Sequence, residues 1–280
     1  MRTVRGACVL ITGAASGMGK LYAIRALSEG AAAVVLWDVN AEALAATEAE
    51  LTANSAKTRI RSYTVDVSDM GAIAKAAQQV RKHGLEPDIL INNAGIVRGN
   101  EYFWNTDAGA DVRPTILVNT LAPMLIAREF LPGMIARGRS ARIVNVASAA
   151  GTLGNPRMAS YAGSKAAVIG WSDSLRIELR QSGNARIAVT TVAPTYISTG
   201  MFAGAKGPAL APIMTPEFVV NRVWNAMLHG DAFVFLPWSV KLSRALKAIL
   251  PTPLFDWLVG GVLGVYSSMD KFTGRAGERR

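Results

Sequence analysis

The sequence predicts an α/β fold in which helices cover both faces of a parallel sheet. Short apolar runs rich in valine and isoleucine alternate with longer amphipathic stretches, as expected when a crossover helix follows each strand. A glycine-rich turn also stands between the first apolar run and the first amphipathic stretch. Together these observations favour a doubly wound, Rossmann-type sheet of about seven strands.

The individual elements follow from this alternation. We predict strands over residues 7–12, 33–37, 60–67, 88–91, 142–147, 187–193 and 232–236. We predict helices over residues 19–29, 41–52, 70–83, 114–137, 161–182 and 216–228. Because no repeat or low-complexity linker divides them, we expect residues 1–237 to form one catalytic domain and residues 238–280 a C-terminal helical extension.

Composition narrows the class of protein. The chain has 280 residues, 50% of them hydrophobic, which is enough to bury a sizeable core. Its net charge is +10, but the basic residues are scattered, which disfavours a nucleic-acid partner. With one cysteine, Cys8, and two distant histidines, His83 and His229, we expect neither a disulfide nor a metal site. No apolar window reaches the ~20 residues of a membrane span, so we expect a cytoplasmic protein.

The turn after the first strand has the pattern of a dinucleotide site. It contains Gly13, Ser16, Gly17, Met18 and Gly19 and opens the first helix. Glycines let the backbone turn sharply and approach a pyrophosphate, while the helix N-terminus offers free N–H groups to it. A glycine-rich turn alone is a weak signal, but its place between strand and helix strengthens it.

Acidic and small residues end the next strands. Asp38 lies near the ~20-residue spacing at which a carboxylate accepts hydrogen bonds from the adenosine ribose and repels a 2′-phosphate. No arginine or lysine stands beside it, so we expect NAD to be preferred over NADP. Asp66, which ends the third strand, is expected at the adenine edge. The fourth strand ends in small residues that let the chain pass close to a cofactor, Asn93, Ala94 and Gly95.

A second group of polar residues predicts proton transfer. Ser148 ends the fifth strand, and Tyr161 and Lys165 stand one helical turn apart at the start of the following helix. Parallel sheets place ligands at the carboxyl ends of their strands, which brings these residues toward the cofactor. A free tyrosine is a weak base at neutral pH, so we expect the ammonium of Lys165 and a positive nicotinamide ring to lower the pKa of Tyr161.

These motifs resemble the short-chain dehydrogenase/reductase family over almost the whole chain. Five occur in order: TGAASGMG (12–19), NNAG (92–95), VNTLAP with Asn119, Ser148, and YAGSK (161–165). The resemblance implies that Tyr161 is the general acid/base and that Ser148 hydrogen-bonds the substrate oxygen. It implies that Lys165 holds the nicotinamide ribose and that Asn119 positions a relay water. It also implies further cofactor contacts by Asn93, Asp66, Val67, Pro194, Ile197 and Thr199, whereas Thr195 replaces the usual glycine.

Further segments resemble one branch of this family, which holds epidermal retinol dehydrogenases and lipid-droplet 17-beta-hydroxysteroid dehydrogenases. They are residues 37–40, 146–151, 199–202 and the tail from 235 to 274. The branch implies a hydrophobic alcohol or carbonyl substrate, such as a retinoid, steroid or long-chain alcohol, and membrane association. Because the chain begins almost at its first strand, we expect a soluble or peripheral relative. The family also implies a homodimer or homotetramer built on the helices near Pro114 and Tyr161.

The C-terminal extension leaves three interpretations open. Residues 239–250 form a basic amphipathic pattern, with Leu242, Leu246 and Ile249 on one face and Lys241 and Arg244 on the other. This segment and the apolar stretch 255–266 are expected to lie at a membrane interface, to cover an apolar substrate as a lid, or to pack on the core or a sister subunit. Loop 203–212 is also expected to be a mobile lid. The alternative function is an NAD(H)-binding, membrane-associated sensor with little catalysis.

Overall fold

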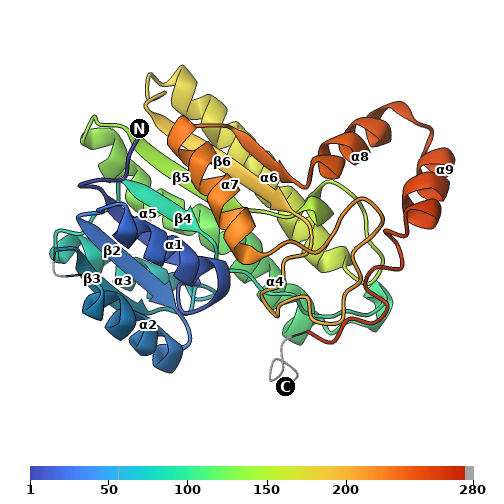
Figure 1. Ribbon diagram of the computed structural model, residues 1–280, viewed down its shortest axis with the longest axis horizontal. Coiled ribbons are helices and arrows are strands. Elements are labelled where there is room, and N and C mark those ends of the chain that lie inside the picture. The colour runs from blue at the N-terminus through green and yellow to red at the C-terminus, as the bar shows by residue number, and fades with distance from the viewer. Residues whose placement is uncertain (56, 275–280) are drawn as a thin grey trace.

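The protein is described by a computed structural model that covers residues 1–55 and 57–274 (Figure 1). Its centre is one seven-stranded sheet with strand order β3-β2-β1-β4-β5-β6-β7, and every neighbouring pair is parallel. The strands are β1 Cys8–Thr12, β2 Ala33–Asp38, β3 Arg59–Thr64, β4 Ile89–Asn92, β5 Ala141–Val146, β6 Ile187–Pro194 and β7 Phe233–Leu236. This order confirms the expected doubly wound sheet, whose strand order reverses between β1 and β4.

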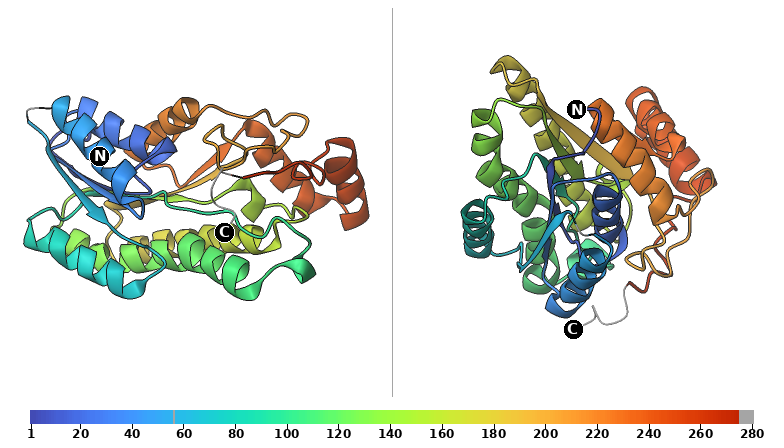
Figure 2. Two further views of the ribbon diagram at one scale, coloured as in Figure 1. Left: turned by 90° about the horizontal axis from the view of Figure 1, so that it is seen from below. Right: turned by 60° about the vertical axis from the view of Figure 1, so that its left-hand side comes forward.

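Helices cover both faces of the sheet, so that the molecule has three layers (Figure 2). One face carries α1 Gly17–Ser28, α2 Ala41–Ala53 and α7 Pro216–His229, and the other carries α3 Met70–Lys82, α5 Ala122–Ala136 and α6 Ala159–Gln181. Each face has its own apolar core. Tyr22 and Trp224 are buried in the first core, and Trp37 and Phe130 in the second. The strands are buried on both faces, which explains their nearly continuous apolar sequences.

The third strand is shorter than we predicted. The expected strand over residues 60–67 is β3 Arg59–Thr64, because the chain leaves the sheet after Val65 donates to the carbonyl of Asp38. The carboxylate of Asp66 then accepts hydrogen bonds from the backbone N–H and the hydroxyl of Ser68, at 2.8 and 2.7 Å. This local turn competes with further strand pairing, as aspartate side chains commonly do. Asp66 and Val67 therefore stand in a loop at the edge of the sheet.

The predicted helix over residues 114–137 is interrupted. The helical region begins earlier, at the π-turn η2 Ala108–Val112, and continues through α4 Arg113–Ile116, the π-turn η3 Leu117–Leu121 and α5. Pro123 lacks the N–H that would bond to the carbonyl of Asn119 in a regular α-helix, which favours the wider turn at this point. Asn119 consequently lies in the irregular part of the helix, with its side chain buried.

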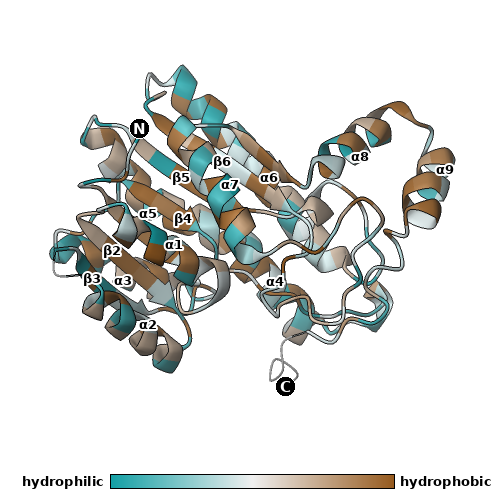
Figure 3. Cartoon of the chain, in the orientation of Figure 1, coloured by the Kyte–Doolittle hydropathy of each residue, from teal (hydrophilic) through white to brown (hydrophobic). Residues whose placement is uncertain are grey.

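The C-terminal extension forms two helical segments that project beside the sheet. They are α8 Trp238–Ile249, and α9 Thr252–Phe255 continued by the π-turn η5 Asp256–Val262. Hydrophobic and hydrophilic residues alternate along α8, and most residues of the following segment are hydrophobic (Figure 3). Within the described residues, the helices are all too short or too polar to cross a bilayer. The chain then returns to the body, where the N–H of Lys206 donates to the carbonyl of Ser268, and that of Thr273 to the carbonyl of Ala203.

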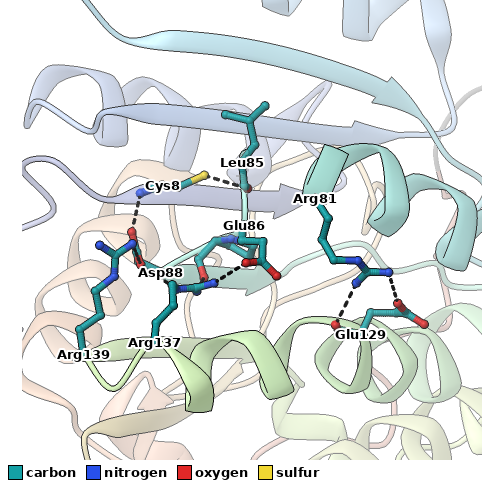
Figure 4. A network of polar contacts seen from close by, with 9 residues as sticks. Cys8, Arg81, Leu85, Glu86, Asp88, Glu129, Arg137 and Arg139 are labelled. Atoms are coloured by element: carbon teal, nitrogen blue, oxygen red, sulfur yellow. Dashed lines mark hydrogen bonds and ion pairs between the residues drawn. The ribbon is translucent and has the colours of Figure 1, made fainter. Parts of the chain in front are cut away.

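A polar network lies at the edge of the sheet where the strands begin (Figure 4). The carboxylate of Asp88 accepts from the N–H of Cys8 at 3.0 Å and pairs with Arg139 at 2.6 Å, while Arg137 pairs with Glu86 at 3.1 Å. The Cys8 thiol donates to the carbonyl of Leu85. Burial raises the pKa of this thiol to about 12, so Cys8 is a structural residue, as its apolar sequence context indicates.

Candidate active site

The glycine-rich turn has the shape of a phosphate cradle. Gly13 and Gly17 have φ angles of +65° and +52°, in the left-handed region that favours glycine. A side chain at Gly19 would overlap the carbonyl oxygen of Gly13, so only glycine allows α1 to pack this closely under the turn. Ser16 occupies the N-cap of α1 without capping the helix with its hydroxyl, which leaves that hydroxyl available to a ligand.

Asp38 is held in place at the end of β2. Its carboxylate accepts from the N–H of Ala15 at 2.9 Å and from the N–H of Asn40 at 3.0 Å. These two bonds fix the carboxylate beside the glycine-rich turn and leave it half-buried at the cleft. Thr47 of α2 donates to the carbonyl of Ala15 and supports the same turn from below.

Thr12 joins the two strands between which the sheet order reverses, a role that the sequence motifs do not reveal. Its hydroxyl oxygen accepts from the N–H groups of Asn93 and Ala94, both at 3.0 Å. The side-chain amide of Asn93 donates in return to the carbonyl of Thr12 at 3.1 Å. The hydroxyl residue directly before the first glycine was the only available signal. Its partner lies about 80 residues further along the chain, and the periodicity of the sequence does not reveal that contact.

These elements surround a cleft of about 380 Å³ at the carboxyl ends of the strands. Of the sixteen cofactor residues that we expect, fifteen line it: Gly13, Ser16, Gly17, Met18, Asp38, Asp66, Val67, Asn93, Ala94, Gly95, Tyr161, Lys165, Pro194, Ile197 and Thr199. Gly19 is the exception, because it packs beneath the turn. Ser148 also lines the cleft, whereas Asn119 lies behind its wall. Lys165 is the only cation among the lining residues that the structure describes.

The structure brings Ser148, Tyr161 and Lys165 to one place. Tyr161 and Lys165 lie on the same face of α6, and the Lys165 Nζ is 5.8 Å from the centre of the Tyr161 ring. This ammonium donates to the carbonyl of Val146 at the end of β5, at 2.9 Å. The Ser148 hydroxyl lies 3.4 Å from the carbonyl oxygen of Pro194 at the end of β6. The three side chains therefore converge where the ends of β5 and β6 meet α6.

Asn119 is held behind this group by a two-way amide contact. Its Oδ1 accepts from the N–H of Ile96, and its Nδ2 donates to the carbonyl of Ile96, both at 2.9 Å. Nδ2 also donates to the hydroxyl of Ser164 at 3.2 Å, a second buried residue that we did not single out within YAGSK. A side chain at Gly95 would come within 3.3 Å of Asn119 Oδ1 and 3.4 Å of Lys165 Nζ. Asn119 Oδ1 and Lys165 Nζ thus both lie next to Gly95, and no hydrogen bond joins them.

The pKa of Tyr161 differs from our expectation. Burial raises it to about 12, and the Ser148 hydroxyl beside it acts in the opposite direction. In the protein alone, burial of the phenol therefore outweighs the lowering that we expected from the Lys165 ammonium. The part expected from a positive nicotinamide ring stays a prediction. Burial also lowers the pKa of Lys165 to about 8. Lys165 is therefore the first of the two groups to lose its proton as the pH rises.

The segment after β6 does not need the usual glycine. Thr195 donates its N–H to the carbonyl of Leu236 at 2.9 Å and is not among the residues with a positive φ. Ile197 forms a bridge with Met214, which closes the loop between β6 and α7 at its base. The substitution of threonine therefore leaves the backbone regular and adds a hydroxyl to the site.

Comparison with known proteins identifies the family. A family model described as short chain dehydrogenase matches residues 7–207, which include the glycine-rich turn, Ser148, Tyr161 and Lys165. The chain belongs to the short-chain dehydrogenase family. It is therefore an oxidoreductase that uses a nicotinamide cofactor, and the alternative of a sensor with little catalysis is not favoured.

Relatives of this short-chain dehydrogenase place it in the expected branch. Epidermal retinol dehydrogenase 2 of Mus musculus is 36% identical over 277 residues, which cover 98% of this chain and 87% of the relative. Estradiol 17-beta-dehydrogenase 11 of Homo sapiens is 34% identical over 250 residues, which cover 89% and 81%. Both relatives are matched over most of their length.

Solved structures agree with the fold. A short chain dehydrogenase/reductase from Burkholderia phymatum in complex with NAD has a TM-score of 0.79 and 25% identity, and the match covers 89% of this chain and 95% of that one. A short chain dehydrogenase from Burkholderia cenocepacia in complex with NADP has a TM-score of 0.75 and 24% identity, with coverages of 92% and 99%. Both cofactors therefore occur among proteins of this fold.

Proposed function

We propose that this short-chain dehydrogenase transfers a hydride between NAD(H) and a lipophilic alcohol or the corresponding carbonyl compound. One observation carries the proposal: Ser148 and Tyr161 line both the cofactor cleft and an adjoining pocket with mostly apolar walls. An apolar molecule in that pocket would present its oxygen to these two hydroxyls. The retinol and estradiol named for the relatives are alcohols of this kind.

The roles of the chain's residues follow from this arrangement. The cofactor supplies or accepts the hydride. Tyr161 gives a proton to the substrate oxygen during reduction and takes it back during oxidation, and Ser148 donates a hydrogen bond to the same oxygen. Lys165 is a buried base with a pKa of about 8, which suits it to exchange that proton with the tyrosine. Asn119 holds the loop after β4 beside Lys165 and is proposed to position the water that carries the proton onward.

The reaction is tested by NADH formation with purified protein, NAD and a panel of retinol, steroid alcohols and long-chain secondary alcohols. Turnover of at least one of them supports the proposal, and NADP is run in parallel. If the protein binds NAD but oxidises none of these alcohols, the proposed substrate class is wrong.

We propose that NAD is the preferred cofactor, because Asp38 is fixed at the cleft with no lysine or arginine beside it among the lining residues that the structure describes. The variant Asp38→Asn keeps an acceptor for the N–H of Ala15 but removes the charge. We expect the ratio of kcat/KM for NAD to that for NADP to fall about 10- to 100-fold, the effect of one or two hydrogen bonds to a charged group.

The control for this prediction is Glu42→Gln, which removes a charge from an exposed position in the first turn of α2. This variant is expected to keep the wild-type ratio, so that a change in Asp38→Asn cannot be attributed to net charge. A wild type that prefers NADP, or an unchanged ratio in Asp38→Asn, would disprove the assignment of Asp38.

We propose that the catalytic domain ends at residue 237 and that the extension from residue 238 completes the substrate pocket. Val240, Leu242 and Leu246 of α8 line that pocket together with the loop 208–211. Loop 203–212 is bonded to the returning tail, for example by the N–H of Ala209 to the carbonyl of Leu263 at 3.0 Å. The extension thus covers the pocket, as a lid would, and also packs on the body of the protein, so these two interpretations are compatible. Residues 275–280 lie outside the described part of the chain.

The outer face of the extension supports a membrane contact, and we propose an anionic bilayer as its partner. Trp238, Ile249 and Trp257 are 64%, 77% and 64% exposed, although their side chains are large and apolar. Lys241 and Arg244 are exposed on the same helix, α8. Aromatic and aliphatic side chains next to cations are typical of segments that lie in the interface of an anionic membrane.

The double variant Trp238→Ser, Trp257→Ser tests this contact by flotation with vesicles of phosphatidylcholine and phosphatidylserine. We expect vesicle affinity to fall at least about tenfold, since two large apolar side chains no longer enter the bilayer. Met70→Ser is the control, because Met70 is exposed at the start of α3, far from the extension (Figure 1). Equal binding of all three proteins, or no binding by the wild type, would exclude the contact.

We also propose a homodimer or homotetramer, built on the helices near Pro114 and Tyr161. Two large apolar side chains are exposed there, Ile116 of α4 and Ile177 of α6, at 40% and 42%. Multi-angle light scattering measures the molar mass directly, and a mass near the 29.7 kDa of one chain would contradict this proposal.

A further inference from the structure

The pocket beside the cofactor cleft has mostly apolar walls, but several hydroxyl residues also line it. Its walls include Leu153, Met158, Phe202, Leu242, Leu246 and Leu263. Ser148 and Tyr161 line it at the reacting end, where the proposed function places the substrate oxygen. The hydroxyl residues Thr195 and Ser239 line the same pocket, and no role has yet been assigned to them.

Both of these hydroxyls are buried without a hydrogen-bond partner. Within residues 1–55 and 57–274, neither Thr195 Oγ1 nor Ser239 Oγ has a donor or an acceptor in reach. Ser239 is only 8% exposed. A buried hydroxyl that makes no hydrogen bond destabilises the folded protein. Unlike Tyr22 and Thr190, whose buried hydroxyls also lack a partner within the described residues, Thr195 and Ser239 line a pocket in which a ligand could supply the missing bond.

The two residues are neighbours in the fold although 44 positions separate them. Pro194 at the end of β6 pairs with Leu236 at the end of β7, and Thr195 donates its N–H to the carbonyl of Leu236 at 2.9 Å. Ser239 follows three residues after Leu236, in the first turn of α8. The two residues therefore follow adjacent strand ends, and both line the pocket.

The pair is also next to the catalytic serine. The Ser148 hydroxyl lies 3.4 Å from the carbonyl oxygen of Pro194, whose peptide bond leads directly into Thr195. Ser148 and Thr195 both line the cofactor cleft and the adjoining pocket, so a substrate oxygen held by Ser148 would lie near Thr195. A second oxygen on a nearby substrate carbon would meet Thr195 and Ser239, while the rest of an aliphatic chain would lie among the apolar walls.

We propose that Thr195 and Ser239 bind a second oxygen of the substrate, so that the preferred substrates are lipophilic alcohols or ketones with another hydroxyl or oxo group close to the reacting carbon. Vicinal diols and α-hydroxy ketones with a long aliphatic chain belong to this class. Each hydroxyl of the pair both donates and accepts, so either kind of oxygen satisfies it. This inference rests on the proposed function, because it uses the same pocket and reaction.

The test compares kcat/KM for dodecane-2,3-diol and dodecan-2-ol with NAD, since the two substrates share chain length and reacting group. In the wild type, the ratio of diol to mono-alcohol is expected to be about 100, because each of the two hydroxyls contributes about tenfold. Thr195→Val, which keeps the shape of threonine, and Ser239→Ala are each expected to lower this ratio about tenfold, the effect of one hydrogen bond. The double variant brings the ratio close to one.

Thr190→Val is the matched control. Thr190 lies five residues earlier on β6, and its buried hydroxyl likewise has no partner within the described residues, but it does not line the pocket. This variant is expected to keep the wild-type ratio, and melting temperatures show that all four variants fold. A ratio near one in the wild type, or a ratio that survives in Thr195→Val and Ser239→Ala, overturns the proposal.

Failure of the proposed function gives a different result, because neither alcohol is then oxidised. The hydroxyl pair is still tested in that case by the rise in melting temperature that each compound causes in the presence of NAD. A larger rise with the diol, which disappears in the double variant, supports the pair as a binding site. Equal rises with both compounds overturn it.

Discussion

Tyr161→Phe is expected to reduce kcat for alcohol oxidation about 10³-fold, within the range found when a positioned acid/base is removed. The variant loses one hydroxyl but keeps the ring, which packs edge-on against Phe202 with ring centres 6.0 Å apart. The shape of the pocket should therefore be retained, and the affinity for NAD should remain close to that of the wild type. Steady-state kinetics measure kcat, and calorimetric titration with NAD measures the affinity.

Tyr22→Phe provides the control for this result. Tyr22 is also fully buried, and its hydroxyl has no partner among the described residues, but it lies in the core between α1 and α7. Loss of the Tyr22 hydroxyl is expected to leave kcat unchanged. If Tyr161→Phe kept the wild-type turnover, Tyr161 would not be the acid/base, and the proposed mechanism would fail.

Lys165→Met is expected to lower kcat/KM for oxidation about 10²-fold and to change its dependence on pH. Oxidation needs a base, so the wild-type rate should rise with pH as the pair loses its first proton, near the pKa of about 8 of Lys165. Without the lysine, only the phenol of Tyr161 remains to titrate, and burial raises its pKa to about 12. The rise near pH 8 should therefore disappear from a profile of kcat/KM against pH.

Stability measurements distinguish this effect from unfolding. Burial lowers the pKa of Lys165 from 10.5 to about 8, so the unfolded chain binds more protons between these values and the free energy of unfolding rises with pH across that window. Below pH 8 the folded protein carries the full cost of a buried ammonium. Lys165→Met removes this cost and should melt at a higher temperature at pH 7. A variant that is active near pH 8 with the wild-type profile would rule out the lysine as the first group to titrate.

Much of the fold could be predicted because it depends on local patterns. Each strand is buried on both faces and is therefore a short apolar run, and each surface helix repeats its apolar residues with its own period. The glycine-rich turn needs backbone conformations and close packing that glycine alone provides, at Gly17 and Gly19 for example. Local rules failed where a side chain competed with the backbone, as Asp66 does at the end of β3, or where Pro123 interrupted a helix.

In the candidate site, too, the features that depend on local spacing could be predicted, and those that depend on distant contacts could not. Tyr161 and Lys165 could be paired from the sequence because four residues on a helix bring two side chains to one face. The raised pKa of Tyr161 could not be predicted, since it depends on the residues that bury the phenol, and these come from several distant segments. Thr12 and Ser164 were missed for a related reason, because their hydroxyls act on Asn93 and Asn119, which are distant in the chain.

The sequence by itself determined the class of fold, the cofactor turn and the types of residue that carry the chemistry, because these depend on spacings within one helix, strand or turn. Only the tertiary structure decided which polar groups meet, how deeply they are buried and which of them lack a partner. The hydroxyls of Thr195 and Ser239 illustrate this: they become neighbours only when β6 and β7 pair. Burial and hydrogen bonding depend on distances in space, and the spacing of residues within one short segment does not reveal those distances.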